Sequence, residues 1–96
     1  MAAKHGVNGL TRAAALDYSS HGIRVNSVCP GVIETESLER ESAADPALRS
    51  WFVEKHPIGR LGRPSEIGDA VVWLVSDAST FVTGQAIAVD GAYSSQ

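Results

Sequence analysis

Two short stretches of the sequence hold the side chains that could do chemistry. Near the beginning, Lys4 lies in the first turn of a predicted helix, surrounded by small residues. Further along, Pro30-Gly31 ends an apolar run and opens the segment PGVIET, which closes on the hydroxyl of Thr35. Such a turn lies at the carboxyl edge of a sheet, where open α/β folds bind ligands. Taken alone, Lys4 is an ordinary solvated helix lysine and Gly31 relieves strain in a tight turn.

Metal and thiol chemistry find no support in the sequence pattern. His5, His21 and His56 lie far apart, without the paired Cys or Asp residues that a metal site uses. No metal site is therefore expected. Cys29 is the single cysteine, so an intrachain disulfide is excluded, and we predict a small buried residue there.

Five elements are expected to position these residues. Hydrophobic spacing and turn signals predict a helix over 2–21, a strand over 22–30, an irregular loop and lid over 32–62, a helix over 64–76 and a strand over 84–91. Within the lid, Asp45-Pro46 starts one short helix and the rest is expected to be irregular. A helix leading into a β-branched run is half of a βαβ unit. The order therefore predicts α/β architecture, the C-terminal half of a doubly wound parallel sheet.

The packing faces of these elements can also be predicted. The helix over 2–21 has an apolar stripe of Val7, Leu10, Ala14 and Ala15. It has a second stripe of small residues that includes Gly6 and Gly9, and we expect the helix to be pressed against a neighbour. The helix over 64–76 has an expected buried face formed by Ile67, Ala70, Val71, Leu74 and Val75. The strand over 84–91 is apolar without alternation, as in strands covered on both faces.

Composition excludes several classes of protein. A net charge of −3 over 96 residues argues against a nucleic-acid surface, and the length suits one domain. No apolar run approaches the roughly 20 residues of a membrane span, and the beginning has no secretory pattern, so a cytoplasmic location is expected. No glycine-rich phosphate loop is present in these residues.

Two longer blocks carry a resemblance to a known family. The block AAKHGVNGLTRAAALDYSSHGIRVNSVCPGVIET resembles the short-chain dehydrogenases/reductases from their active-site helix through the following strand. The block HPIGRLGRPSEIGDAVVWLVSDASTFVTGQAIAVDGAY resembles the C-terminal segment of the classical branch of that family. The resemblance implies a Rossmann-like fold and an NAD(P)-dependent oxidoreductase. Such enzymes move hydride between a nicotinamide and a small carbonyl or alcohol substrate.

The resemblance also implies roles for single residues. The family's Tyr-x-x-x-Lys motif places its lysine at Lys4 and its tyrosine directly before Met1. Residues four apart share a helix face, so the ammonium reaches both the phenol and the nicotinamide ribose, and it lowers the pKa of the phenol. Lys4 is thus the one catalytic residue of the motif present in this chain. The chain is expected to be a portion of such an enzyme.

The cofactor loop of the family matches Pro30, Gly31, Ile33 and Thr35. In relatives, backbone groups near the position of Ile33 hold the nicotinamide carboxamide, and the threonine contacts the carboxamide or the pyrophosphate. Because the glycine-rich motif, the substrate serine and the tyrosine are not among these residues, we expect the isolated chain to bind NAD or NADP weakly or not at all. We expect it to lack dehydrogenase activity.

Two further hypotheses remain. The chain could be a non-catalytic module that associates with itself or with a complete relative, through the helix over 2–21 and the surface of residues 64–91. In relatives the last helix and strand form a two-fold interface, which would bury Trp73. Alternatively, the chain could be a gene-model fragment without an independent role.

Overall fold

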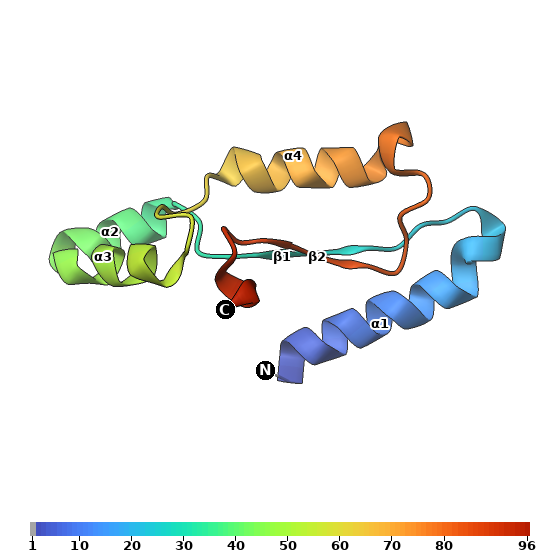
Figure 1. Ribbon diagram of the computed structural model, residues 1–96, viewed down its shortest axis with the longest axis horizontal. Coiled ribbons are helices and arrows are strands. Elements are labelled where there is room, and N and C mark those ends of the chain that lie inside the picture. The colour runs from blue at the N-terminus through green and yellow to red at the C-terminus, as the bar shows by residue number, and fades with distance from the viewer. Residues whose placement is uncertain (1) are drawn as a thin grey trace. The chain divides into compact units, whose positions relative to one another are not determined.

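The computed structural model describes residues 2–96 (Figure 1). In chain order the elements are α1 (Ala2–Tyr18), the 3-10 helix η1 (Ser19–His21), β1 (Ser27–Pro30), α2 (Glu36–Ala44), α3 (Pro46–Lys55), α4 (Pro64–Val75), the 3-10 helix η2 (Asp77–Ser79), β2 (Ala86–Val89) and the 3-10 helix η3 (Tyr93–Ser95). The chain divides into two compact units. Unit 1 is the chain up to Cys29 with Ala70–Ile87, and unit 2 is Pro30–Asp69 with Ala88–Gln96.

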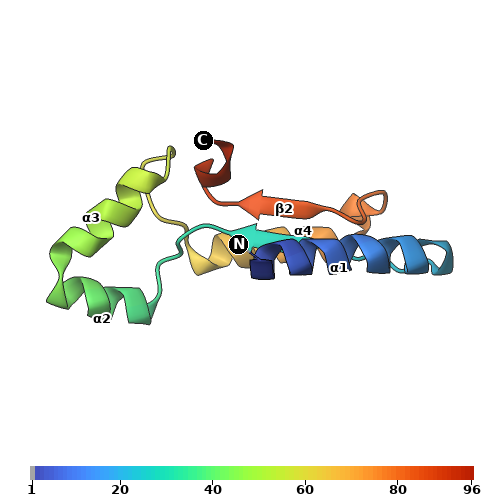
Figure 2. The same ribbon diagram turned by 90° about the horizontal axis from the view of Figure 1, so that it is seen from below.

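The two strands form a parallel sheet. The N–H of Ser27 donates to the carbonyl of Gln85 at 2.9 Å, and the N–H of Gly31 donates to the carbonyl of Val89 at 3.2 Å. Figure 2 shows the arrowheads of β1 and β2 pointing the same way. The connection between them contains α2, α3 and α4, as a parallel pair requires a long crossover. The predicted α/β class with a parallel sheet is confirmed.

Both strands are shorter than predicted. The strand predicted over 22–30 is Ser27–Pro30, and the one predicted over 84–91 is Ala86–Val89. Before β1, side chains share in the pairing: the N–H of Val25 donates to Thr83 Oγ1, and Asn26 Oδ1 accepts from the N–H of Gln85, both at 3.1 Å. One main-chain hydrogen bond remains there, from the N–H of Gly84 to the carbonyl of Val25 at 2.7 Å, so side-chain oxygens interrupt the ladder without ending it.

In unit 1, α1 faces the strands with a polar and small-residue face. Thr11 and Ala15 are buried, with exposed fractions of 7% and 4%. Ser27 Oγ donates to Asn8 Oδ1 at 3.2 Å, which ties α1 to β1. A Cβ at Gly84 would lie 3.3 Å from the Cβ of Ala15, so the chain before β2 passes close to the helix. Asn8, Thr11 and Ala15, at positions i, i+3 and i+7, therefore lie on the same face of α1, the one turned to the strands.

The predicted packing of α1 is only partly observed. Val7 and Leu10 are 55% and 71% exposed, and no atom lies within 4 Å of a Cβ built at Gly6 or Gly9. The apolar stripe packs only at its C-terminal end, where Ala15 is buried against the segment at Gly84. The glycines of the small-residue stripe have no close neighbour among residues 2–96, so the part of the helix that packs is set by where the chain before β2 approaches Ala15.

The buried face predicted for α4 is present only in part. Leu74 is buried and Ile67 and Ala70 are half-buried, whereas Val71 and Val75 are 43% and 76% exposed. Exposure alternates along β2, so this strand is covered on one face instead of two. Within unit 1, α1 lies on one side of the strands and the orange half of α4 on the other (Figure 1). Two strands offer too little sheet surface to cover both helices.

In unit 2, the lid segment is more regular than predicted. The helix expected from Asp45-Pro46 is α3, with Pro46 at its first position, but α2 precedes it and packs against it. Thr35 begins α2 as its N-cap, since its Oγ1 accepts from the N–H of Leu38 at 3.1 Å. Two acidic residues in the first turn of α2 interact favourably with the positive N-terminal end of the helix dipole. Periodicity missed α2 because its exposed faces are polar almost all round.

Within residues 2–96, no helix is both long and apolar enough to cross a bilayer.

Candidate cofactor site

The loop after β1 begins with a glycine that close packing requires. Gly31 lies in unit 2, and its φ is not in the left-handed region. A Cβ at this position would lie 2.7 Å from His56 Nε2 and 3.0 Å from the Cα of Asp90. The alternative interpretation of Gly31, relief of backbone strain in a tight turn, is therefore not supported. Glycine leaves room for the backbone to pass the end of β2 and the imidazole ring.

Ile33 leaves a donor and an acceptor unused on its main chain. It forms an isolated parallel bridge with Gly62: the N–H of Gly62 donates to the carbonyl of Val32 at 3.1 Å, and the N–H of Glu34 donates to the carbonyl of Gly62 at 2.9 Å. In such a bridge, the N–H and C=O of the central residue both point to the opposite side. Among residues 2–96 neither group of Ile33 has a hydrogen-bond partner.

This pair of groups has a definite chemical complement. A backbone N–H donates and a backbone carbonyl accepts, and on an extended residue the two lie side by side. A primary carboxamide presents the opposite arrangement, an acceptor oxygen beside a donor NH₂. The unused edge of Ile33 therefore fits a carboxamide, which is the polar group of nicotinamide.

Thr35 lies two residues further along and has a structural task. Its Oγ1 accepts from the N–H of Leu38 as the N-cap of α2. A hydroxyl both accepts and donates, so the hydrogen of this hydroxyl remains available while the cap is made. The residue is exposed, as is Pro30 at the end of β1. Thr35 can thus cap α2 and donate to an external acceptor at the same time.

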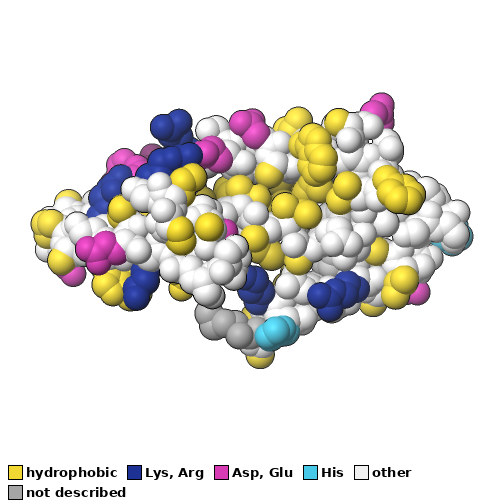
Figure 3. Space-filling model, viewed as in Figure 1, with side chains coloured by type: hydrophobic (Ala, Val, Ile, Leu, Met, Phe, Trp, Pro, Cys, Tyr) yellow, Lys and Arg dark blue, Asp and Glu magenta, His cyan; other side chains and the backbone are white. Residues whose placement is uncertain are grey.

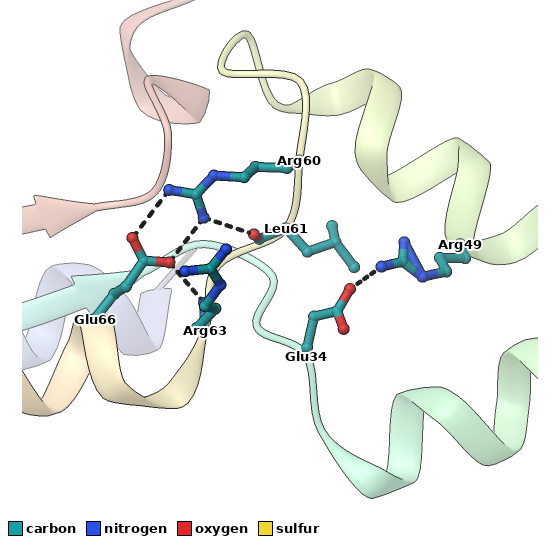
Figure 4. Close-up of polar contacts among 6 residues, drawn as sticks. All are labelled: Glu34, Arg49, Arg60, Leu61, Arg63 and Glu66. Carbon is teal, nitrogen blue, oxygen red and sulfur yellow. Dashed lines mark hydrogen bonds and ion pairs between the residues drawn. The ribbon is translucent and has the colours of Figure 1, made fainter.

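A cleft in unit 2 adjoins this loop. Its volume is about 390 Å³, and its lining includes Gly31, Val32 and Ile33 from the loop, the segment after β2, and the Arg60–Glu66 pair. Arg60 Nη1 and Nη2 donate to the two carboxylate oxygens of Glu66 at 2.7 and 3.0 Å, and the N–H of Arg63 also donates to Glu66 (Figure 4). These hydrogen bonds lower the pKa of Glu66 to about 2 and raise the pKa of Arg60.

A second ion pair fastens the start of the lid. Arg49 on α3 pairs with Glu34, which follows Ile33 in the loop (Figure 4). Both side chains are partly exposed, so the pair contributes little to stability. Its position links α3 to the segment that carries the unused edge of Ile33.

His56 is a site residue that the sequence interpretation missed. It is 3% exposed, and its Nε2 accepts from the N–H of Val32 at 3.1 Å. From the sequence, His56 was discussed only in relation to metal binding, and no metal site was expected. Among residues 2–96 no group of three metal-ligating side chains is present. The available signal was its place directly after α3, where a side chain can bind the last free carbonyls of a helix.

The structure gathers part of the predicted site in one unit. Pro30, Gly31, Ile33 and Thr35 follow one another at the end of β1 in unit 2. Lys4 lies on α1 in unit 1, is exposed, and forms no hydrogen bond or ion pair with any other described residue. Cys29 is half-buried instead of fully buried.

Comparisons with known proteins identify relatives of this chain. A family model described as Enoyl-(Acyl carrier protein) reductase matches residues 1–94. Cyclohexanol dehydrogenase from Acinetobacter sp. (strain SE19) is 51% identical over 96 residues, which are 100% of this chain and 36% of that protein. The chain thus spans little more than a third of the length of the curated relatives it matches.

Two solved structures share the fold. ElxO with NADP bound has a TM-score of 0.90 and 34% identity, covering 97% of this chain and 38% of that one. A 4-hydroxyisoleucine dehydrogenase complexed with NADH has a TM-score of 0.89 and 36% identity, covering 99% of this chain and 39% of that one. Because the family model covers almost every residue, the chain belongs to the short-chain dehydrogenase/reductase family.

Proposed function

We propose that this chain provides the nicotinamide-binding edge and the active-site lysine of an NAD(P)-dependent oxidoreductase. The reaction is hydride transfer between NAD or NADP and a small alcohol or carbonyl substrate. The single observation that supports it most is the unused N–H and C=O of Ile33, a residue that lines the cleft of unit 2. The relatives named above support the class of reaction and the choice of cofactor.

In this proposal each residue has a limited task. The backbone of Ile33 holds the carboxamide and so decides which ring face meets the substrate. Thr35 donates its free hydroxyl hydrogen to the cofactor while it caps α2. Lys4 holds the ribose hydroxyls and lowers the pKa of a tyrosine phenol that stands four residues before it in the family motif. A nicotinamide cofactor supplies the hydride chemistry when it is bound.

A chimera tests the proposal directly. The 96 residues replace the matching segment of cyclohexanol dehydrogenase, which aligns with the whole chain. We expect the folded chimera to oxidise cyclohexanol with formation of NADH or NADPH, measured by absorbance. A chimera that melts cooperatively but shows no turnover would contradict the proposal.

Variants of the chimera assign the role of Lys4. Lys4→Met removes the ammonium that acts on phenol and ribose, so we expect kcat/KM to fall by about 100-fold or more. Arg12→Met is the matched control, because Arg12 is an exposed cation on the same helix. Equal effects of the two substitutions would remove Lys4 from the active site.

The isolated chain is expected to be inactive. It holds the carboxamide edge and the lysine but no glycine-rich phosphate loop. Titration of NADH fluorescence with the purified chain should show weak binding or none. Micromolar binding with turnover would contradict this expectation.

A specific observation also favours association of the chain with itself or with a relative. Large apolar side chains are exposed on α1, on α4 and on the loop after it; they include Leu16, Val72, Val75 and Phe81, with exposed fractions of 84%, 65%, 76% and 102%. Figure 3 shows hydrophobic side chains gathered over α4. We propose these surfaces as contacts of a homo-oligomer. A monomer mass from size-exclusion chromatography with light scattering would contradict this.

A further inference from the structure

The imidazole of His56 has its proton assigned by its two partners. Its Nδ1 lies 2.7 Å from the carbonyl oxygen of Phe52, and its Nε2 lies 3.1 Å from the backbone nitrogen of Val32. A carbonyl only accepts, so Nδ1 must carry a hydrogen. A backbone N–H only donates, so Nε2 must be free of one. The ring is therefore the neutral Nδ1–H tautomer.

These two bonds join the lid to the cofactor loop. Phe52 belongs to the last turn of α3, and Val32 directly precedes Ile33 in the loop. The imidazole thus closes one free carbonyl at the end of α3 and at the same time holds a loop N–H. Loop and helix lie 24 residues apart in the sequence at this contact.

The bond to Val32 completes the edge of the loop opposite to the unused groups of Ile33. Gly62 binds the carbonyl of Val32 and the N–H of Glu34, which fixes the peptide planes on both sides of Ile33. The N–H of Val32 is the next group on that same side, and His56 binds it. The peptide groups before and after Ile33 are therefore held on the side of Gly62 and His56. The N–H and C=O of Ile33 itself point to the opposite side.

The surroundings of the ring keep it in place. It is 3% exposed, and a Cβ at Gly31 would lie 2.7 Å from Nε2, so only glycine leaves space for it there. The ring of Tyr93 lies 5.3 Å away, between centroids, and closes another side. A buried ring with both nitrogens bonded has one orientation, which is what positioning requires.

We propose that His56 is a positioning residue for the nicotinamide carboxamide. It acts through Val32 on Ile33, as a neutral imidazole that couples the last turn of α3 to the cofactor loop. Its importance for the cofactor rests on the function proposed above, whereas its tautomer and its bond to Val32 do not. The two can therefore be tested separately.

The first test measures the tautomer in the 96-residue chain. Long-range ¹H–¹⁵N spectra should show a protonated, pyrrole-like Nδ1 and an unprotonated, pyridine-like Nε2 for His56 at neutral pH. His5 and His21 are exposed and serve as internal controls in the same spectrum. An Nε2–H tautomer, or ring signals of His56 that coincide with those of the two controls, would overturn the proposal.

The second test uses substitutions at the ring. His56→Leu removes the acceptor, and we expect hydrogen exchange at the Val32 amide to accelerate about tenfold or more. His56→Gln keeps an acceptor oxygen of similar reach and should restore most of the protection. His21→Leu, at an exposed histidine, should leave the Val32 amide unchanged. Equal exchange rates in His56→Leu and the unmodified chain would overturn the bond.

The third test measures the consequence in the active chimera. His56→Leu should raise KM for the nicotinamide cofactor about tenfold or more with a smaller change in kcat, and His56→Gln should reverse most of this. An unchanged cofactor KM in His56→Leu, with Val32 exchange accelerated, would refute the positioning role alone. A folded parent chimera without turnover would refute the function proposed above, and the tautomer would still decide the bond.

Discussion

At the scale of single residues, Glu66 shows how a surface carboxylate can be strongly held. Arg60 binds both of its oxygens and the N–H of Arg63 binds one of them. The resulting pKa of about 2 lies below the ordinary value of 4.5. A carboxyl group with a lower pKa in the folded than in the unfolded state stabilises the fold above its unfolded pKa, and this contribution is lost as the pH falls.

We therefore expect the stabilisation from Glu66 to disappear between pH 4.5 and about 2. Glu66→Gln should remove this part of the pH dependence of the unfolding free energy, measured by urea denaturation over that range. Glu41→Gln is the control, since the Glu41 carboxylate has no hydrogen bond or ion pair with another described residue. Identical profiles for Glu66→Gln and the unmodified chain would contradict the prediction.

Thr35 combines a cap with a candidate cofactor contact. Thr35→Ala removes the acceptor for the N–H of Leu38, so we expect a loss of about 1 kcal/mol in unfolding free energy. Thr35→Ser keeps the hydroxyl and should retain most of that stability. Chemical denaturation followed by circular dichroism measures both. Equal losses from the two substitutions would mean that the hydroxyl is not the capping group.

At the scale of elements, the glycines of the cofactor loop and of α4 should respond in opposite ways to alanine. A Cβ at Gly31 meets the Cα of Asp90 at 3.0 Å as well as the ring of His56, so Gly31→Ala should cost about 1–3 kcal/mol. Gly68 lies inside α4 with no atom within 4 Å of a Cβ built there. Gly68→Ala should therefore gain up to about 1 kcal/mol. Thermal unfolding of both variants measures the contrast, and destabilisation of both would contradict the packing described.

Element types followed from the sequence more readily than their packing. The apolar periods predicted helices over 2–21 and 64–76, and the structure has α1 and α4 there, since helix formation depends on residues three and four apart. The polar helix α2 was not predicted, because its sequence has no apolar period. The packing faces were predicted only in part: Ala15 and Leu74 are buried as their helical spacing indicates, but Val75 on the same predicted face as Leu74 is exposed, because burial depends on contacts with segments distant in the sequence.

At the scale of the whole molecule, most large apolar side chains stay open to solvent. The buried apolar residues among 2–96 are Ala15, Leu38, Leu61 and Leu74, a small core for a chain that is 44% hydrophobic. Because burial of apolar surface is the main favourable term in folding, such surfaces favour association with another chain.

Phe81 and Leu74 separate association from folding. Phe81 is 102% exposed, so Phe81→Ser should leave the unfolding temperature unchanged and lower the mass measured by light scattering at high concentration. Leu74 is 7% exposed, and Leu74→Ala should instead cost about 2–5 kcal/mol of stability. An unchanged mass for Phe81→Ser would remove this surface from the proposed oligomer contact.

The sequence by itself determined the family, the α/β class and the position of the loop after β1, because these depend on local spacing and on short ordered motifs such as PGVIET. Only the tertiary structure decided why Gly31 must be glycine, which peptide groups of Ile33 stay free, and that His56 holds Val32. The physical reason is distance along the chain. Gly62 and His56 reach the loop only after the lid has folded back, and no local pattern records that contact.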